Sequence, residues 1–379
     1  MTATVPVESS GLVELRYRYG PQLLPAGGDP TSMWRYRALL PLDDQPIRYS
    51  LPVGGTPLLA LPGLRRASKL PNLWIKDETR SPTCSNKDRA TALSCELALR
   101  EEKIAITAAS TGNVAVSLAI GAAAAGLEAM IFVAAGVGEG KLRLMLQAGA
   151  RVFKVEEGYE AAFRLSRKAA AKFGWYDRNT GVNPATLEAK KTVALEIWEQ
   201  LGRAVPDVVV VPAGDGTTLS ALAKGFRELV LCRATDHLPR LIGVQAEGCQ
   251  PLKRTWEGKR CGPIRGTCAD GIYVASPSNA ATAVRDVKES HGAFVAVSDE
   301  AILAAMDELA SRGGVLAEPA AAASYAGLLV ARDAGLIDPS EIVVAEITGS
   351  ALKTPHLLPC QAGSVHTIRA TLAEIERVL

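Results

Sequence analysis

The sequence shows no marked excess of charge of either sign: its 379 residues include 42 basic and 40 acidic side chains. These charges are spread along the chain, with neither a basic cluster nor an acidic tail. Binding to a polyanion through surface charge needs a concentrated basic face. We therefore expect no nucleic-acid partner.

Paired cysteines are also absent. No CxxC spacing occurs, and the seven cysteines are scattered, at Cys84, Cys95, Cys232, Cys249, Cys261, Cys268 and Cys360. An odd, scattered set of thiols is typical of a reducing compartment, and the lack of paired ligands argues against a structural zinc site. The sequence therefore predicts a cytoplasmic protein with reduced cysteines and no bound metal.

The chain lacks an uninterrupted apolar run long enough to cross a membrane. Its most apolar tract, residues 114–135, is interrupted by Gly121, Gly126 and Glu128. A spanning helix needs about 20 consecutive, mainly apolar residues. No basic and apolar leader opens the sequence either. We expect no membrane contact, and we interpret the tract as a buried helix, a turn and a buried strand.

Aromatic residues make up only 5% of the chain, while 48% of the residues are hydrophobic. From residue 73 onward, short apolar runs alternate with helix-length segments, which is typical of βαβ units with mainly parallel sheets. The length favours two α/β domains, or one large domain with a smaller insert. The predicted strands are 73–77, 104–107, 129–133, 151–155, 207–211, 241–245, 293–297 and 341–347.

Two stretches depart from this alternation. The first sixty or so residues are rich in proline and charge, and we expect them to wrap over the main body as an arm. Residues 253–278 are rich in glycine, proline, cysteine and basic side chains, which predicts long loops.

The first segment with candidate catalytic residues surrounds Lys87, in Ser81-Pro-Thr-Cys-Ser-Asn-Lys-Asp-Arg. This lysine comes just before a predicted helix over residues 89–100. The positive end of a helix and burial both favour the neutral amine over the ammonium, and a neutral lysine is a nucleophile that can form a Schiff base. A solvated lysine that merely precedes a helix would fit the same segment.

A second segment, Ser110-Thr-Gly-Asn, lies between a predicted strand and an apolar helix. Ser110, Thr111 and neighbouring amides could hold a carboxylate there, while Asn113 could hydrogen-bond a ring hydroxyl. An ordinary capped helix start has the same composition.

A third segment, Pro212-Ala-Gly-Asp-Gly-Thr-Thr, also joins a predicted strand to a helix. Gly214 and Gly216 allow the backbone to approach a dianion, and Thr217 and Thr218 add hydroxyl donors. It matches neither a Walker A loop nor the dinucleotide fingerprint. Asp215 would repel a phosphate, so we expect its side chain to point away and cap the helix.

A fourth segment, Thr348-Gly-Ser-Ala-Leu-Lys, follows the last predicted strand. It delivers the hydroxyl of Thr348 to the carboxyl end of that strand, where open α/β sheets bind ligands. A plain exit from strand to loop has the same features.

In this order, the four segments resemble the fold-type II enzymes that depend on pyridoxal 5'-phosphate (PLP), also called tryptophan synthase beta-like, and among them the threonine synthases. The patterns NPTGSFKDR, ASTGN and TGxGLK of that family match residues 81–89, 109–113 and 348–353, and its glycine-rich phosphate loop matches residues 213–218. The resemblance extends from about residue 33 nearly to the end.

This resemblance implies a function for each matched position. Lys87 would hold PLP as a Schiff base and, once displaced by substrate, act as general base at Cα. Asn113 would contact the ring oxygen, Thr348 would face the ring nitrogen, and Ser110, Thr111 and Gly112 would bind the substrate carboxylate. The cofactor phosphate would lie on the loop formed by Gly214, Asp215, Gly216, Thr217 and Thr218.

The resemblance also implies two doubly wound α/β domains with mainly parallel sheets and PLP between them. Residues 61–90 and 180–379 would form the large PLP-binding domain and residues 91–179 a smaller, mobile domain, with residues 1–60 as the arm. A homodimer is expected.

Several positions depart from the family pattern. Cys84 stands where the family has glycine, and Asn86 stands where it usually has phenylalanine. Cys84 could be reactive or could simply line the pocket. In the family segment NSxNPYRxE, a serine and an arginine bind the phosphate of the substrate, and here those positions are Gly181 and Thr186.

These departures bear on the substrate. Each lost charge-assisted hydrogen bond is worth about 1.5–3 kcal/mol, which predicts poor use of O-phosphohomoserine. Arg89 and Lys190 are the nearby basic residues in the sequence, but we expect Arg89 to support the lysine loop and Lys190 to lie on an exposed helix face.

The leading hypothesis is therefore PLP-dependent elimination or replacement at the β or γ carbon of a small amino acid. The alternatives are threonine synthase itself, a serine or threonine dehydratase, and a non-catalytic regulatory protein, against which the complete set of matched residues argues. An oxidoreductase that binds a dinucleotide is disfavoured because the GxGxxG fingerprint is missing.

Overall fold

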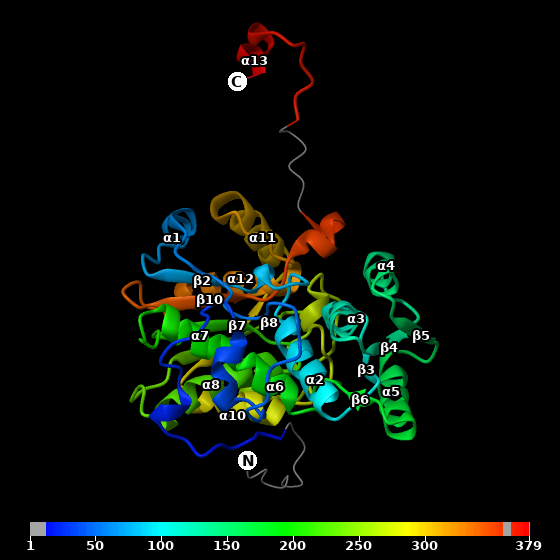
Figure 1. The fold of residues 1–379 in the computed structure, drawn as a ribbon. Coiled ribbons are helices and arrows are strands. Elements are labelled where there is room, and N and C mark those ends of the chain that lie inside the picture. Colours follow the sequence, from blue (N-terminus) through cyan, green and yellow to red (C-terminus); the bar gives the residue numbers. More distant parts are fainter. Residues whose placement is uncertain (1–12, 359–364, 379) are drawn as a thin grey trace.

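Two separate β-sheets organise the chain in the computed structural model, which describes residues 13–358 and 365–378 (Figure 1). The larger sheet has the order β1-β2-β10-β7-β8-β9 and the smaller sheet the order β5-β4-β3-β6. All paired strands run parallel except β1 and β2. The strands are β1 (Leu58–Leu59), β2 (Leu73–Asp77), β3 (Ala105–Ala109), β4 (Glu128–Ala134), β5 (Arg151–Val155), β6 (Tyr176–Asp177), β7 (Val208–Pro212), β8 (Arg240–Ala246), β9 (Ala293–Val297) and β10 (Val343–Ile347).

The helices follow the alternation that the sequence predicts. They are α1 (Pro62–Ser68), α2 (Lys87–Arg100), α3 (Asn113–Ala125), α4 (Glu139–Gln147), α5 (Tyr159–Phe173), α6 (Ala185–Lys190), α7 (Thr192–Gln200), α8 (Thr217–Leu231), α9 (Pro251–Trp256), α10 (Ala280–Glu289), α11 (Asp299–Gly313), α12 (Pro319–Asp333) and α13 (Leu372–Val378). Short 3-10 helices lie at Pro21–Leu23, Met33–Leu39, Glu78–Arg80, Asp270–Ile272, Ala351–Lys353 and Pro355–Leu357.

The α/β fold class with mainly parallel sheets is confirmed, and all eight predicted strands are present, with ends within two residues of the prediction. The sequence analysis missed β1 and β6, which have two residues each and carry no periodic signal. Residues 253–278, which were expected to form only loops, include the end of α9 and a 3-10 helix. Within the described ranges, no helix combines the length and the apolar character needed to cross a membrane.

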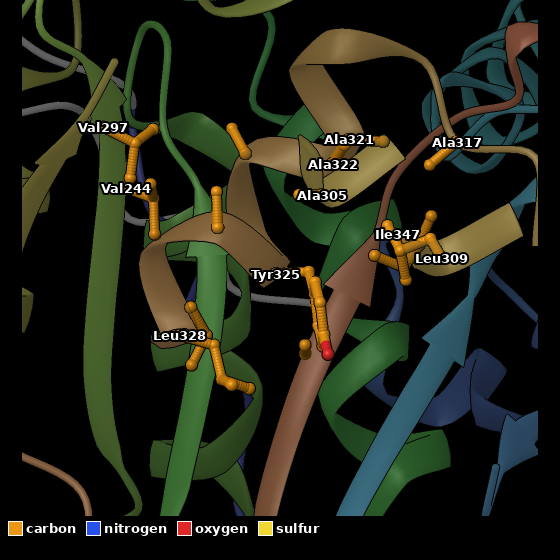
Figure 2. Close-up of a cluster of buried hydrophobic side chains, with 14 of the residues drawn as sticks. Val244, Val297, Ala305, Leu309, Ala317, Ala321, Ala322, Tyr325, Leu328 and Ile347 are labelled. Carbon is orange, nitrogen blue, oxygen red and sulfur yellow. The ribbon is translucent and has the colours of Figure 1, made fainter. Parts of the chain in front are cut away.

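The core of the larger sheet depends on small side chains. Helix α12 packs on β10, β7 and β8 through a run of alanines, and Figure 2 shows Tyr325 and Leu328 of this helix beside Val244 and Ile347 of the strands. A β carbon at Gly327 would lie 2.3 Å from Cγ2 of Val244, so only glycine fits at this crossing. Abundant alanine and glycine therefore allow the helix to lie close to the sheet.

The segment before β1 packs against helices of the larger sheet. Tyr17 Oη donates to Glu188 on α6 at 2.8 Å, and Tyr19 Oη donates to Glu228 on α8 at 3.2 Å. Both carboxylates also pair with Lys191, at 2.6 Å and 2.8 Å. Residues 1–12 of the predicted arm lie outside the described residues, and the division into an arm and two domains stays a prediction.

Helix α2 is joined to its surroundings by a buried ion cluster. Arg89 is fully buried and forms two hydrogen bonds with the carboxylate of Glu78, at 2.8 Å and 2.7 Å. It also pairs with Glu196 on α7 at 2.6 Å, and Lys76 on β2 pairs with the same carboxylate at 2.7 Å. The expectation that Arg89 supports the lysine loop agrees with this placement two residues after Lys87.

We expect Arg89→Met to lower the free energy of unfolding by about 3 to 5 kcal/mol, because it leaves two buried carboxylates without their shared cation. Urea denaturation followed by circular dichroism would measure the change. The control is Arg143→Met, because Arg143 pairs with Glu139 while both side chains are about three-quarters exposed. That variant should change stability by less than about 1 kcal/mol. Equal effects of the two substitutions would contradict the expectation.

Candidate functional site

Lys87 is the first residue of α2, two residues earlier than the sequence predicted. Its amine keeps some exposure and has no hydrogen bond or ion pair to any residue that the structure describes. Burial lowers the pKa of Lys87, although the carboxylates of Asp215, Glu318 and Glu346 act in the opposite direction. The predicted direction is therefore confirmed, and the amine is biased toward its nucleophilic form.

The loop before Lys87 is held by the end of β10. The amide of Asn86 donates to the carbonyl of Thr348 at 2.8 Å, and the amide of Ser350 donates to the carbonyl of Cys84 at 2.9 Å. Lys353 Nζ adds hydrogen bonds to the carbonyls of Thr83 and Cys84 at 2.9 Å and 2.8 Å. The first and fourth predicted segments are thus in direct contact.

Cys84 has a φ of 56°, in the left-handed region that glycine adopts without strain. This conformation suits the glycine of the family pattern, and nothing in the structure explains the cysteine that stands here. The thiol is partly exposed. Cys84 is one of six cysteines in the described ranges, all of them free, and Cys360 lies outside those ranges.

Asn113 begins α3 and reaches the segment after β10. Its Nδ2 donates to both carboxylate oxygens of Glu318, at 2.7 Å and 2.9 Å, while its Oδ1 is buried without a partner. A β carbon at Gly349 would lie 2.5 Å from Oε1 of Glu318 and 3.4 Å from Nδ2 of Asn113. Glu318 therefore joins two predicted segments, although it was not among the predicted site residues.

Ser110, Thr111 and Gly112 follow β3 and are all partly exposed. Ser110 Oγ accepts a hydrogen bond from the amide of Gly112 at 3.1 Å. Within the described part of the chain, the amides of Thr111 and Asn113 have no partner. They lie at the N-terminus of α3, so an anion such as a carboxylate can be bound there.

The glycine loop between β7 and α8 presents free amides. In the described ranges, no hydrogen bond satisfies the amides of Gly214, Asp215, Gly216 and Thr218. Gly216 has a φ of 87°, and a β carbon there would lie 2.7 Å from Cβ of Ala283. Adjacent unsatisfied amides at a helix N-terminus fit a phosphate.

The expected cap by Asp215 is present at the start of α8. Its carboxylate accepts from the amide and the hydroxyl of Thr217, both at 2.9 Å, so it caps the start of α8. The hydroxyl of Thr217 is engaged in this cap, while the hydroxyl of Thr218 accepts a hydrogen bond from Lys190.

Lys190 was expected on an exposed helix face, and this expectation is wrong. The side chain is buried, with 3% exposure, and its Nζ donates to Thr218 Oγ1 at 3.1 Å. Burial and then the nearby Lys87 lower the pKa of Lys190 to about 7. Helix α6 is buried on every side, so its sequence gave no sign of a polar face.

Glu346 on β10 is a second buried group that the sequence did not reveal. Asn86 Nδ2 donates to its Oε1 at 3.2 Å, and its Oε2 has no partner. Burial, together with repulsion from Glu78, raises the pKa of Glu346 to about 7. The departure at Asn86 therefore places an amide against a carboxyl group beside Lys87.

The segments of the two sheets meet at the carboxyl ends of β3, β7 and β10, as the rule for open α/β sheets predicts. A family model described as pyridoxal-phosphate dependent enzyme matches residues 49–349. The chain belongs to this family. Its cofactor is therefore PLP, and the lysine amine and the free amides of the glycine loop fit the aldehyde and the phosphate of that group.

Relatives of similar sequence indicate to which group within the family the chain belongs. The chain is 37% identical over 329 residues to a threonine synthase from Methanosarcina acetivorans, covering 86% of this chain and 80% of that protein. It is 36% identical over 328 residues to a threonine synthase from Methanocaldococcus jannaschii, covering 85% and 81%. The chain is a PLP-dependent lyase or synthase of the threonine synthase-like group.

The fold is also shared with solved structures. The processed form of threonine deaminase isoform 2 from Solanum lycopersicum matches with a TM-score of 0.68 at 20% identity, covering 93% of this chain and 94% of that chain. At this identity the likeness shows the fold alone, which is that of the fold-type II PLP enzymes.

We expect Gly216→Val to weaken PLP retention, because the added side chain is strained at a positive φ and obstructs the backbone amides. The ratio of bound PLP to folded protein after dialysis would measure this. Gly138→Val is the control, since Gly138 has a φ of −65° and a β carbon there meets nothing within 4 Å. A folded Gly216→Val variant with unchanged PLP affinity would refute the assignment.

We expect Lys190→Met to stabilise the PLP-free protein, most strongly at and below pH 7. The pKa of Lys190 is about 7 in the folded protein against an ordinary 10.5, so charging it disfavours the folded state fully below pH 7. That cost declines as the pH rises from 7 to 10.5. The gain should therefore fall from an order of 2 to 4 kcal/mol toward zero across this window.

Urea denaturation at several pH values would measure the gain, with Lys288→Met on an exposed position as the control. The gain should shrink when PLP is bound, since a phosphate beside Thr218 favours the charged amine. A gain that does not depend on pH would contradict the burial of a titrating Lys190.

Proposed function

We propose that this enzyme eliminates a leaving group from the γ carbon of a homoserine-type amino acid and adds water at the β carbon, which is the reaction of threonine synthase. The observation that carries the proposal is the lysine amine at the start of α2, which lacks a partner and has a lowered pKa beside the free amides of the glycine loop. The relatives named threonine synthase, at 34–37% identity, support the γ carbon.

The proposed assignment of residues follows the segments that converge at the site. Lys87 binds PLP as a Schiff base, and Gly214, Asp215, Gly216, Thr217 and Thr218 surround its phosphate. Bound PLP supplies an electron sink for the carbon atoms of the substrate. Asn113 is placed for the ring oxygen, and the hydroxyl of Thr348 for the ring nitrogen.

The remaining residues act on the substrate. Ser110, Thr111 and Gly112 hold its carboxylate at the N-terminus of α3, which fixes Cα beside the lysine. The Lys87 amine, once released, takes the proton from Cα, and its lowered pKa suits a base that works near neutral pH. A neutral hydroxyl at the ring nitrogen tempers the electron sink, which favours elimination and replacement over transamination.

Two further expectations from the sequence stay part of this proposal. The enzyme works as a homodimer, with the smaller domain mobile, and it is cytoplasmic, as the scattered cysteines suggest. Sedimentation analysis of the purified protein tests the oligomeric state. The dehydratase alternative is supported by threonine deaminase structures at 20% and 25% identity, lower than the 34–37% of the relatives named threonine synthase.

Borohydride reduction of the PLP-bound enzyme, followed by peptide mapping, should label Lys87, because only this lysine is placed at the start of α2 beside the glycine loop. Lys87→Ala should lose the label and the release of the γ leaving group, while Lys288→Met keeps both. Turnover of O-phosphohomoserine and O-acetylhomoserine to threonine would be assayed together. A label on another lysine, or turnover that persists in Lys87→Ala, would overturn the assignment.

A further inference from the structure

Arg178 is a fully buried arginine that forms no ion pair with any carboxylate in the described part of the chain. Its Nη1 donates to Thr180 Oγ1 at 3.0 Å, while its Nε and Nη2 are buried and have no partner. Arg89 is equally buried, but all three of its nitrogens are hydrogen-bonded and it pairs with two carboxylates. The two arginines are therefore equally buried and differ in their hydrogen-bond and ion-pair partners.

The two unpartnered nitrogens lie on the same edge of the guanidinium, which we call the Arg178 edge. This edge presents two parallel N–H groups, whose spacing matches two oxygens of a phosphate or a carboxylate. Burial lowers the pKa of Arg178 to about 10, so the group is still charged at neutral pH. A buried cation without a counterion is unfavourable, so the edge is built for an anion that is not part of the chain.

The acidic groups near Arg178 do not supply that anion. The groups whose charges act on it are Cys95, Asp88, Asp215 and Tyr159. Asp88 accepts from the amide of Thr83 at 2.7 Å, and Asp215 caps α8, so both carboxylates are engaged elsewhere. Lys87 and Lys190 add positive charge on the same side.

The position of Arg178 places it on the substrate side of the site. It directly follows β6, and its amide donates to the carbonyl of Thr107 on β3 at 2.9 Å. The next residue, Asn179, accepts from the amide of Ala109 at 2.8 Å. Strand β3 leads into Ser110, so Arg178 is fixed to the strand that carries the proposed carboxylate site, whereas the glycine loop follows β7 of the other sheet.

A hydroxyl group lies close to the same segment. Gly181 has a φ of 88°, and a β carbon there would lie 2.4 Å from Oγ of Ser278. A serine at position 181 is therefore strained by this φ, and the Oγ of the exposed Ser278 lies where its β carbon would be. Thr180, which orients Arg178, adds a second hydroxyl.

We propose that the Arg178 edge binds a phosphate-type anion at the end of the substrate side chain. This inference rests on the proposed function and names the substrate class, a homoserine ester with an anionic leaving group. The α-carboxylate of the same substrate is left to Ser110 and Thr111. The sequence-based expectation that O-phosphohomoserine is a poor substrate rested on the missing arginine at position 186. Arg178 would supply the guanidinium that Thr186 lacks, so that expectation loses its basis.

The experiment compares Arg178→Met and Arg178→Lys with the wild-type holoenzyme in three measurements. The first is resistance to urea, where Arg178→Met should raise the midpoint, because an unpaired buried charge has been removed, whereas Arg89→Met lowers it. The second is the rise in melting temperature caused by sulfate relative to chloride at equal ionic strength, which should be lost in Arg178→Met.

The third measurement is the KM for O-phosphohomoserine against that for O-acetylhomoserine. Arg178→Met should raise the KM for O-phosphohomoserine about tenfold to a hundredfold and change the KM for O-acetylhomoserine by less than about twofold. The reason is that a hydrogen bond to a charged group is lost only for the anionic ester. Arg178→Lys keeps the charge without the paired donors, so its KM should fall between wild type and Arg178→Met. If Arg178→Met does not fold, Arg178→Lys takes its place in the test.

Three outcomes would overturn the proposal. A destabilised Arg178→Met, comparable to Arg89→Met, would make the arginine structural. An unchanged sulfate effect would show that the edge binds no anion. Loss of PLP retention with an unchanged KM ratio would assign the arginine to the cofactor phosphate. The sulfate measurement needs no turnover, so it decides the anion site even if neither ester is a substrate and the proposed reaction fails.

Discussion

The amide of Asn86 donates to the carbonyl of Thr348, and this contact joins the lysine loop to the end of β10. Asn86 is the residue that precedes α2, so the contact fixes where the helix begins and which way Lys87 projects. The same loop contributes the bridge between Ser85 and Gly349, and Gly349 lies against Glu318 and Asn113. Through this chain of contacts, the lysine, the start of α3 and the end of the larger sheet take up one arrangement.

Charged groups are buried in two different ways around this arrangement. Arg89, Glu78 and Glu196 satisfy one another, as do Lys191, Glu188 and Glu228, and these sets stabilise the packing of α2, α6, α7 and α8. In contrast, Lys190, Arg178 and Glu346 are buried without full partners among the described residues, and Lys87 is partly exposed without one. Perturbed ionisable groups of this second kind cluster where a protein binds or transforms ligands, because the ligand completes them.

The sequence was sufficient for the parts of the structure that depend on local pattern. Continuous apolar runs predicted the parallel strands, and the segments around Lys87, Asn113, Gly214 and Thr348 were identified because each follows a predicted strand. The first three of them also precede a predicted helix. Helix α2 begins earlier than predicted because the loop contact at Asn86 sets its start. The strands β1 and β6 are too short to produce a period.

The missed site residues depend on tertiary contacts that no local pattern encodes. Lys190 is buried because both faces of α6 are covered, and Arg178 is recognised only by the absence of a partner for its free edge. Glu318 becomes part of the site through a hydrogen bond to Asn113, 205 residues earlier in the chain. Cys84 shows the reverse case, since the sequence showed the departure from glycine while its left-handed φ appears only in the structure.

The contact of Tyr17 with Glu188 connects the N-terminal segment to the short helix α6. Glu188 and Lys190 lie two residues apart, one held by the N-terminal segment and the other by the hydroxyl of Thr218. A helix of six residues has fewer than two turns, so the two contacts lie close together along it. The N-terminal segment around Tyr17 and the glycine loop before α8 are thus connected through one short helix.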